Sequence, residues 1–326
     1  MALFDLPLTE LENYRPTVRK PSDHLHFWTT TLAEAAEHDP LVGVVPVATG
    51  LSLVTTWDVT FTGFAGHHVR AWYTRPAGTE GRRLPVVVEY VGYGRGRGLP
   101  VERLLWPAAG CAHLLVDARG QGGQYGSGGD TPDPIGSAPA APGFLTRGIT
   151  NPSTAYLRRL ITDAARAVDA AAALPDVDDT RIAVVGNSQG GGLAIAAAAL
   201  NQRTAALLAS SPLLCHVERA ITITDAHPYA EIVQYLAVHR DSADRVLDSL
   251  SYFDAVNFAA RTTVPALFAT GLRDTICPPS GVFAAFNALG NEDRDIDVYP
   301  FNHHEGGEAH HQTHQLAWLR DRFGTP

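Results

Sequence analysis

The pentapeptide GNSQG at residues 186–190 is the part of the sequence best suited to nucleophilic chemistry. An apolar run at Ile182–Val185 precedes it and predicts a buried strand, and strong helix formers from Leu193 onward predict a helix. Glycines leave room for an abrupt turn between strand and helix, and that turn presents the Ser188 hydroxyl at the end of the sheet. We therefore predict a nucleophile elbow with Ser188 as the nucleophile.

An acid and a base must assist Ser188, because a serine hydroxyl is a weak nucleophile at neutral pH. Asp274 follows a predicted buried strand at Ala266–Thr270, and loops at the carboxyl ends of such strands gather around one site. We therefore expect Asp274 to be the acid. Asp254 and Asp117 are weaker candidates, and Asp274 could instead be a turn or N-cap aspartate.

Two adjacent histidines, His303 and His304, follow the last predicted strand at Ile296–Tyr299. Both come after Asp274 in the chain, which is the order of nucleophile, acid and base found in enzymes with this elbow. On these grounds either histidine could be the base that takes the Ser188 proton.

The segment FNHHEGGEAHHQTH at 301–314 also permits a metal site, because it holds five histidines and two glutamates. The zinc-protease pattern fails, since two glycines and a glutamate follow the pair His304-Glu305 where a second histidine is needed. His310 and His314 could share one helix face, yet solvated helix histidines explain them equally well. We expect neither a metal nor another cofactor.

The glycine-rich segment GYGRGRG at 92–98 follows a predicted strand at Pro85–Val91. In enzymes with a nucleophile elbow this position supplies one N–H of the oxyanion hole, and the residue after the nucleophile supplies the other. We expect these to be the backbone amides of Tyr93 and Gln189. The segment does not match Gly-x-Gly-x-x-Gly, so dinucleotide binding is not expected.

Buried strands alternate with helices along the chain. Nearly continuous apolar runs predict central parallel strands at Pro85–Val91, Leu114–Asp117, Ile182–Val185, Ala206–Ala209 and Ala266–Thr270. Trp57–Thr62 and Val69–Tyr73 alternate apolar with polar residues and predict an antiparallel pair at the sheet edge. Together with the elbow, this predicts an α/β-hydrolase fold, with a mostly parallel sheet and helices on both faces.

Four longer segments complete the predicted architecture. Leu25–Glu37 predicts a helical arm packed on the body, and Asn151–Ala173 is the clearest internal helix. Leu213–Arg261 predicts a largely helical excursion before the strand that carries Asp274. Gly120–Gly143 predicts a long loop beside the strand ends, a common place for substrate-shaping segments. Nothing divides the chain, so we expect one domain over residues 1–326.

The composition restricts the class of protein. The chain has 326 residues, 45% of them hydrophobic, and a net charge of −9, which disfavours nucleic acid or an anionic membrane as partner. An odd number of widely spaced cysteines, Cys111, Cys215 and Cys277, and an N-terminus unlike a signal peptide predict a cytoplasmic protein. No apolar run reaches the roughly 18 residues of a membrane helix.

Several segments together resemble the acetyl xylan esterase and cephalosporin C deacetylase family of carbohydrate esterases, and the similarity covers nearly the whole chain. The short markers are RGQ at 119–121, GNSQGG at 186–191 and HE at 304–305. The longer segments are PGFLTRGI at 142–149, SYFDAVNFAARTTVPALF at 251–268 and ICPPS at 276–280.

The resemblance implies roles for individual residues. It places nucleophile, acid and base on Ser188, Asp274 and His304, so it selects His304 over its neighbour. The oxyanion donors again fall on the amides of Tyr93 and Gln189. Arg119 and Gln121 become structural residues that hold the elbow by hydrogen bonds. The sequence departs from the family at Asn187, where relatives have a small residue, and in the loop Gly122–Gly129.

The resemblance also implies an activity, removal of acetyl groups from small acetylated sugars and from cephalosporin-type molecules, without a cofactor. It implies a ring-like hexamer, hence a homo-oligomer. A serine peptidase with the same triad, and a metal-dependent or non-catalytic protein of this fold, are the alternatives. We further expect bulky residues to close the acyl pocket around a methyl group, namely Tyr93, Trp106, Leu213, Leu214, Pro228 and Ile276.

Overall fold

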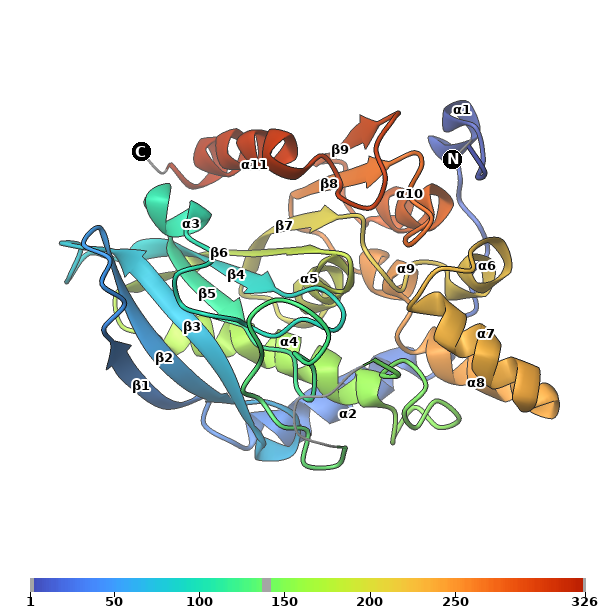
Figure 1. The fold of residues 1–326 in the computed structure, drawn as a ribbon, viewed down its shortest axis with the longest axis horizontal. Coiled ribbons are helices and arrows are strands. Elements are labelled where there is room, and N and C mark those ends of the chain that lie inside the picture. Colours follow the sequence, from blue (N-terminus) through green and yellow to red (C-terminus); the bar gives the residue numbers. More distant parts are fainter. Residues whose placement is uncertain (1–2, 137–141, 325–326) are drawn as a thin grey trace.

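A nine-stranded sheet organises residues 3–136 and 142–324, the part of the chain that the computed structural model describes (Figure 1). The strand order is β1-β2-β3-β5-β4-β6-β7-β8-β9. The pairs β1·β2, β2·β3 and β3·β5 are antiparallel, and all neighbours from β5 through β4 to β9 are parallel. The strands are β1 (Leu41–Val47), β2 (Val54–Thr62), β3 (His68–Pro76), β4 (Leu84–Tyr90), β5 (Ala112–Val116), β6 (Val177–Asn187), β7 (Thr204–Ser210), β8 (Ala266–Gly271) and β9 (Arg294–Tyr299).

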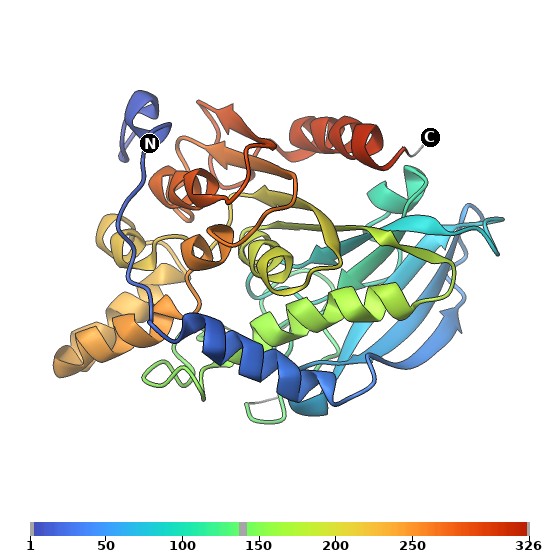
Figure 2. The same ribbon diagram turned by 180° about the vertical axis from the view of Figure 1, so that it is seen from behind.

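Helices cover both faces of this sheet (Figures 1 and 2). On one face α4 and α5 pack against each other and against β6, and on the opposite face α3 contacts β5 and α11 contacts β8. Strand β4 is buried over its whole length, which explains its nearly continuous apolar sequence LPVVVEY. The α-helices are α1 (Leu8–Leu11), α2 (His24–Ala36), α3 (Leu105–Ala108), α4 (Tyr156–Ala173), α5 (Gln189–Leu200), α6 (Val217–Ile223), α7 (Tyr229–Val238), α8 (Ala243–Ser251), α9 (Ala255–Ala259), α10 (Pro279–Ala288) and α11 (Glu308–Phe323).

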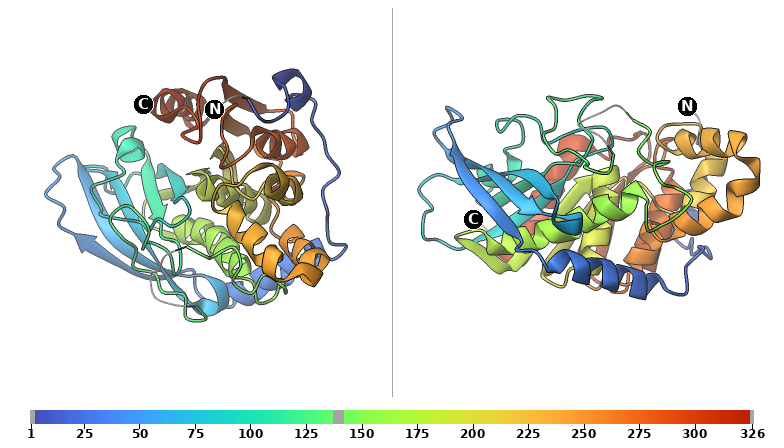
Figure 3. Two further views of the ribbon diagram at one scale, coloured as in Figure 1. Left: turned by 45° about the vertical axis from the view of Figure 1, so that its right-hand side comes forward. Right: turned by 90° about the horizontal axis from the view of Figure 1, so that it is seen from below.

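The N-terminal arm is anchored by aromatic packing. Helix α2 lies beside α4 (Figure 3), and the ring of its Trp28 packs edge-on against Phe253 and Phe258. The Trp28 indole N–H also donates to the carbonyl of Tyr252 at 3.0 Å. These three partners belong to the predicted helical excursion, which forms α6 to α9 between β7 and β8. The arm therefore braces the excursion.

The fold agrees with the predicted α/β-hydrolase architecture, with one strand more than the sequence pattern indicated. Strand β1 pairs with β2 at the sheet edge, but its sequence LVGVVPV contains Gly43 and Pro46, which weaken a strand signal and are tolerated at an edge. Among the described residues, no helix combines the length and apolar character needed to cross a membrane. Residues 137–141 of the predicted loop Gly120–Gly143 lie outside the described part.

Candidate active site

Ser188 occupies the turn between β6 and α5 in a strained conformation, with φ 59° and ψ −122°. A positive φ is uncommon for a residue with a side chain and costs about 1–3 kcal/mol. Glycine is required on both sides of it. A Cβ on Gly186 would lie 2.2 Å from the carbonyl carbon of Gly190, and one on Gly190 would lie 2.1 Å from the oxygen of Tyr90. The GNSQG sequence therefore forms the predicted elbow.

Backbone hydrogen bonds hold the elbow in this conformation. The Ser188 N–H donates to the carbonyl of Ser210 at 3.0 Å, and the Ser188 carbonyl accepts from the N–H of Leu213 at 2.9 Å. Burial raises the pKa of the neighbouring Cys277 thiol, and an interaction with the Ser188 side chain partly offsets that rise. The serine is 7% exposed and lines a cavity.

His304 lines the same cavity as Ser188 and is oriented by Asp274. Its Nδ1 lies 2.8 Å from Oδ2 of Asp274, whose side chain is fully buried. The other oxygen, Oδ1, accepts the backbone N–H groups of Ile276 at 2.8 Å and Cys277 at 2.9 Å. Asp274 thus caps a turn and binds the histidine at once. With Nδ1–H donating to Asp274, the remaining nitrogen of His304, Nε2, is the one that can accept a proton.

The competing residues have other partners. Nδ1 of His303 binds the carbonyl of Arg273 at 2.9 Å. Asp254 accepts the N–H groups of His216 and Val217 at 3.1 and 2.8 Å, and burial raises its pKa to about 6. Asp254 therefore fastens the loop before α6.

Asp117 is also held by the backbone. Its carboxylate accepts the N–H groups of Arg97 at 2.9 Å and Asp130 at 2.7 Å, and burial raises its pKa despite these bonds. It also accepts the Thr131 hydroxyl at 2.9 Å. Asp117 therefore joins the glycine-rich segment after β4 to the long loop after β5.

Gln121 links the two segments that carry the expected oxyanion donors, Tyr93 and Gln189. Its Oε1 accepts the N–H of Gly94 at 2.7 Å, and its Nε2 donates to Oε1 of Gln189 at 2.8 Å. Arg119 supports this arrangement through an ion pair with Asp163, at 2.6 Å between Nη2 and Oδ1. The segment after β4 and the start of α5 are thus held at a fixed separation around Ser188.

The cavity at Ser188 has a volume of about 550 Å³. Of the six bulky residues expected in its wall, Tyr93, Pro228 and Ile276 line it. The other three lie elsewhere. Leu213 and Leu214 are buried in the main hydrophobic core, and Trp106 lines a second hollow beneath α3. The sequence placed these residues near strand ends but did not reveal which face of the sheet each would cover.

The two places at which the sequence is expected to depart from the family both border this cavity. Asn187 lines it beside Ser188, and Gln124 and Tyr125 reach it from the loop Gly122–Gly129. The loop is close-packed, since a Cβ on Gly122 would lie 2.5 Å from the backbone nitrogen of Gly129. Asn187, Gln124 and Tyr125 therefore form part of the cavity wall.

Glu231 on α7 is a site residue that the sequence did not indicate. It is 7% exposed, and its Oε1 accepts the Tyr93 hydroxyl at 2.5 Å and the N–H of Gly143 at 3.0 Å. Its Oε2 accepts the N–H of Leu145 at 3.2 Å, and the Tyr93 oxygen accepts the N–H of Phe144 at 2.8 Å. Burial and the Glu231 carboxylate both raise the pKa of Tyr93. This network fixes Tyr93 and the segment 142–145 against the cavity.

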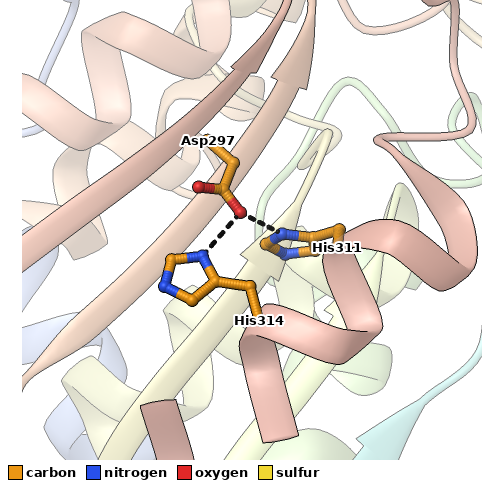
Figure 4. A group of neighbouring side chains, drawn as sticks. All are labelled: Asp297, His311 and His314. Carbon is orange, nitrogen blue, oxygen red and sulfur yellow. Dashed lines mark hydrogen bonds and ion pairs between the residues drawn. The ribbon is translucent and has the colours of Figure 1, made fainter. Parts of the chain in front are cut away.

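Asp297, His311 and His314 are the described residues whose donor atoms could hold a metal ion (Figure 4). Nδ1 of His311 and Nδ1 of His314 lie 2.7 and 2.8 Å from the same oxygen of Asp297. His310, which the sequence placed on one helix face with His314, is not part of this group and packs edge-on against Tyr299. None of these five residues lines the Ser188 cavity.

Comparisons with known proteins identify the family of this chain. The profile of the acetyl xylan esterase family matches residues 1–322. The acetyl xylan esterase from Paenibacillus sp. R4 is 35% identical, with a TM-score of 0.89 and coverage of 97% of this chain and 99% of that one. Acetyl xylan esterase 1 from Thermoanaerobacterium sp. JW/SL YS485 is 31% identical, with a TM-score of 0.87 and the same coverage.

A curated relative, an acetyl esterase from Xylanibacter ruminicola, is 27% identical over 179 residues. The match includes 55% of this chain and spans only 39% of the relative's length. A likeness to puromycin hydrolase, at 18% identity and a TM-score of 0.59, shows the fold alone. On the family profile and the two esterase structures, the chain belongs to the acetyl xylan esterase family and is a carboxylic ester hydrolase.

Proposed function

We propose that the protein removes acetyl groups from small acetylated sugars, including acetylated xylo-oligosaccharides, through an acetyl-enzyme intermediate on Ser188. The observation that carries this proposal is the hydrogen bond between His304 and Asp274 beside a serine on a strained elbow in one cavity. Acetyl release from cephalosporin-type molecules and a hexameric assembly also belong to the proposal, because the family resemblance implies them.

In the first half of the reaction, Nε2 of His304 takes the Ser188 proton as the serine oxygen bonds to the acetyl carbonyl carbon. The carbonyl oxygen becomes an oxyanion, which the amides of Tyr93 and Gln189 stabilise. When the tetrahedral intermediate collapses, the bond to the sugar oxygen breaks and His304 returns its proton to that oxygen. The products are the free sugar hydroxyl and acetylated Ser188.

In the second half, His304 takes a proton from water as the water oxygen attacks the acetyl-serine carbonyl. Collapse of the second tetrahedral intermediate releases acetate and returns the proton to Ser188. Asp274 stays ionised and holds His304 in the required tautomer throughout. The protein's own side chains supply every proton transfer in this scheme.

The test is a comparison of wild type and Ser188→Ala on a panel of acetylated sugars, aryl acetates and a cephalosporin. We expect the wild type to release acetate from the sugars, and the variant to lose several orders of magnitude on every substrate. A wild type that cleaves aryl acetates but no acetylated sugar would contradict the substrate class. Equal activity of the variant would contradict the nucleophile.

A further inference from the structure

A second hollow adjoins the Ser188 cavity and is lined by residues of α3 and α11. Both helices lie on the same face of the sheet (Figure 1). The volume of the hollow is about 600 Å³, within the roughly 300–1,000 Å³ of small-molecule sites. Asn187, Arg95 and Arg103 line both spaces, so the two are neighbours along a shared border. Their positions at the carboxyl ends of β4 and β6 are where ligands bind in open parallel sheets.

Chain neighbours of both Ser188 and His304 line the hollow. His304 returns its proton to the leaving oxygen, so that oxygen lies beside His304 during the reaction. Glu305 and Gly306 follow His304 directly and line the hollow, as does Asn187, which precedes Ser188. A sugar attached to the reacting acetyl group can therefore extend past His304 into this space.

The chemistry of the lining favours a neutral ligand with many hydroxyl groups. Carboxylates outnumber guanidinium groups, because four glutamates and two arginines contribute. Each arginine is also paired with a glutamate of the lining, Arg95 with Glu102 at 2.6 Å and Arg103 with Glu89. An anionic ligand would meet no free positive charge from these residues, whereas hydroxyl groups can both donate to carboxylates and accept from amides.

The amide groups come from α11. Gln312 is exposed and Gln315 is 5% exposed, and both line the hollow on the same helix as Glu308. Trp106 and Leu105 of α3 supply the opposing apolar side. An apolar wall facing amides and carboxylates suits the mixed surface of a pentose ring, which has apolar ring carbons and polar edges.

We propose that this hollow between α3 and α11 binds the neutral sugar residues of an acetylated oligosaccharide, next to the acetylated unit at Ser188. The proposal rests on the proposed deacetylation of sugars and names the site that recognises their length. Uronic-acid branches at the same position are excluded by the surplus of carboxylates.

The test measures kcat/KM for acetylated xylose, acetylated xylotriose and p-nitrophenyl acetate. In the wild type we expect kcat/KM to rise from acetylated xylose to acetylated xylotriose, mainly through a lower KM. We define the substrate ratio as kcat/KM for acetylated xylotriose divided by kcat/KM for p-nitrophenyl acetate. Gln315→Leu and the surface change Gln312→Leu should each lower this ratio about fivefold, which is the effect of losing one neutral hydrogen bond. Gln202→Leu, an identical change at an exposed position outside the hollow, should keep the wild-type ratio.

Three outcomes would be adverse. If both α11 variants kept the wild-type ratio, the sugar site would be wrong while the proposed deacetylation would stand. The same conclusion would follow if the wild type turned over a glucuronate-branched acetylated xylotriose as fast as, or faster than, the unbranched one. A wild type that cleaves p-nitrophenyl acetate but releases no acetate from acetylated xylose or xylotriose would overturn the proposed function itself.

Discussion

Nδ1 of His304 lies 2.8 Å from Oδ2 of Asp274, although the two residues come from loops after different strands. The buried carboxylate is held in turn by two backbone N–H groups on its other oxygen. This leaves the carboxylate little freedom to rotate away from the histidine. The loop after β8 thus sets the orientation of His304, the proposed base, before a substrate binds.

Removing members of this unit should produce unequal losses. We expect Ser188→Ala and His304→Ala each to lower kcat by several orders of magnitude, since nucleophile and base act together, and Asp274→Asn to cost somewhat less. His303→Ala should be far milder, because Nδ1 of His303 binds the carbonyl of Arg273. The measurement is steady-state kinetics on an aryl acetate. An inactive His303→Ala variant together with an active His304→Ala variant would show that the base is misassigned.

Glu231→Gln should lower kcat/KM about tenfold. The substitution turns one acceptor oxygen into an NH₂ group. Within the buried network, this donor then faces another donor, either the N–H of Leu145 or the Tyr93 hydroxyl, and a hydrogen bond is lost. The loss should appear chiefly in kcat, because Tyr93 also supplies an expected oxyanion amide. Glu12→Gln, an exposed position on the N-terminal arm, is the control. Wild-type kinetics in Glu231→Gln would show that the network does not position the site.

Acyl length should be limited by the cavity wall that Tyr93, Pro228 and Ile276 form. A longer acyl chain must displace packed side chains, and overpacking costs about 1–3 kcal/mol, or roughly tenfold to a hundredfold in rate. Acetyl and propionyl esters should be good substrates, butyryl esters poor and octanoyl esters nearly inert. The measurement is kcat/KM for p-nitrophenyl esters of increasing chain length. A flat profile, or a maximum at octanoyl, would show an open acyl channel.

Chelation should leave the initial rate unchanged, because the proposed reaction uses no metal. The cluster of Asp297, His311 and His314 makes this test necessary. His314 is on the surface side of that cluster, so His314→Ala should also keep full activity. Loss of activity with EDTA that zinc restores, together with an inactive His314→Ala, would favour a metal-dependent mechanism.

Acid should destabilise the arm through His24, which is 2% exposed and packs against Tyr252 and Phe258. Burial, aided by the charge of Lys20, lowers its pKa to about 4, against about 6.5 in an unfolded chain. The unfolded chain therefore binds the proton first. The stabilising contribution of neutral His24 is complete above the unfolded pKa and is lost as the pH falls toward 4.

Between pH 7 and 5 this loss amounts to about 2 kcal/mol of the free energy of unfolding. Urea unfolding at the two pH values should show a smaller acid loss in His24→Gln than in the wild type. His26→Gln, at an exposed position on the same helix, should lose as much as the wild type. Equal acid losses in all three proteins would contradict the assignment to His24.

The parts of the fold that the sequence predicted are those where burial dictates composition. Continuous apolar runs marked the central strands, and the glycines around Ser188 marked the elbow, because the close approach to Gly190 and Tyr90 excludes other residues. Strand β1 gave no such signal, since an edge strand tolerates Gly43 and Pro46. A single sequence also does not reveal how many strands the sheet adds at its edge.

The site was predictable where chain order constrains it and unpredictable where tertiary packing decides. Asp274 and His304 follow strands in the order that the elbow requires. Glu231 carried no signal, because a glutamate on a helix is ordinarily solvated and only the fold buries it beside Tyr93. Trp106 was misplaced for the same reason, since the sequence does not state which side of the sheet α3 covers.

Labelling with a serine-directed phosphonate tests whether Ser188 carries the acetyl group. We expect one adduct per chain, on the peptide that contains Ser188, with loss of acetate release in proportion to labelling. Ser188→Ala should take up no label. Labelling of Ser188 with full activity retained, or complete inactivation with the adduct on another residue, would show that Ser188 is not the nucleophile.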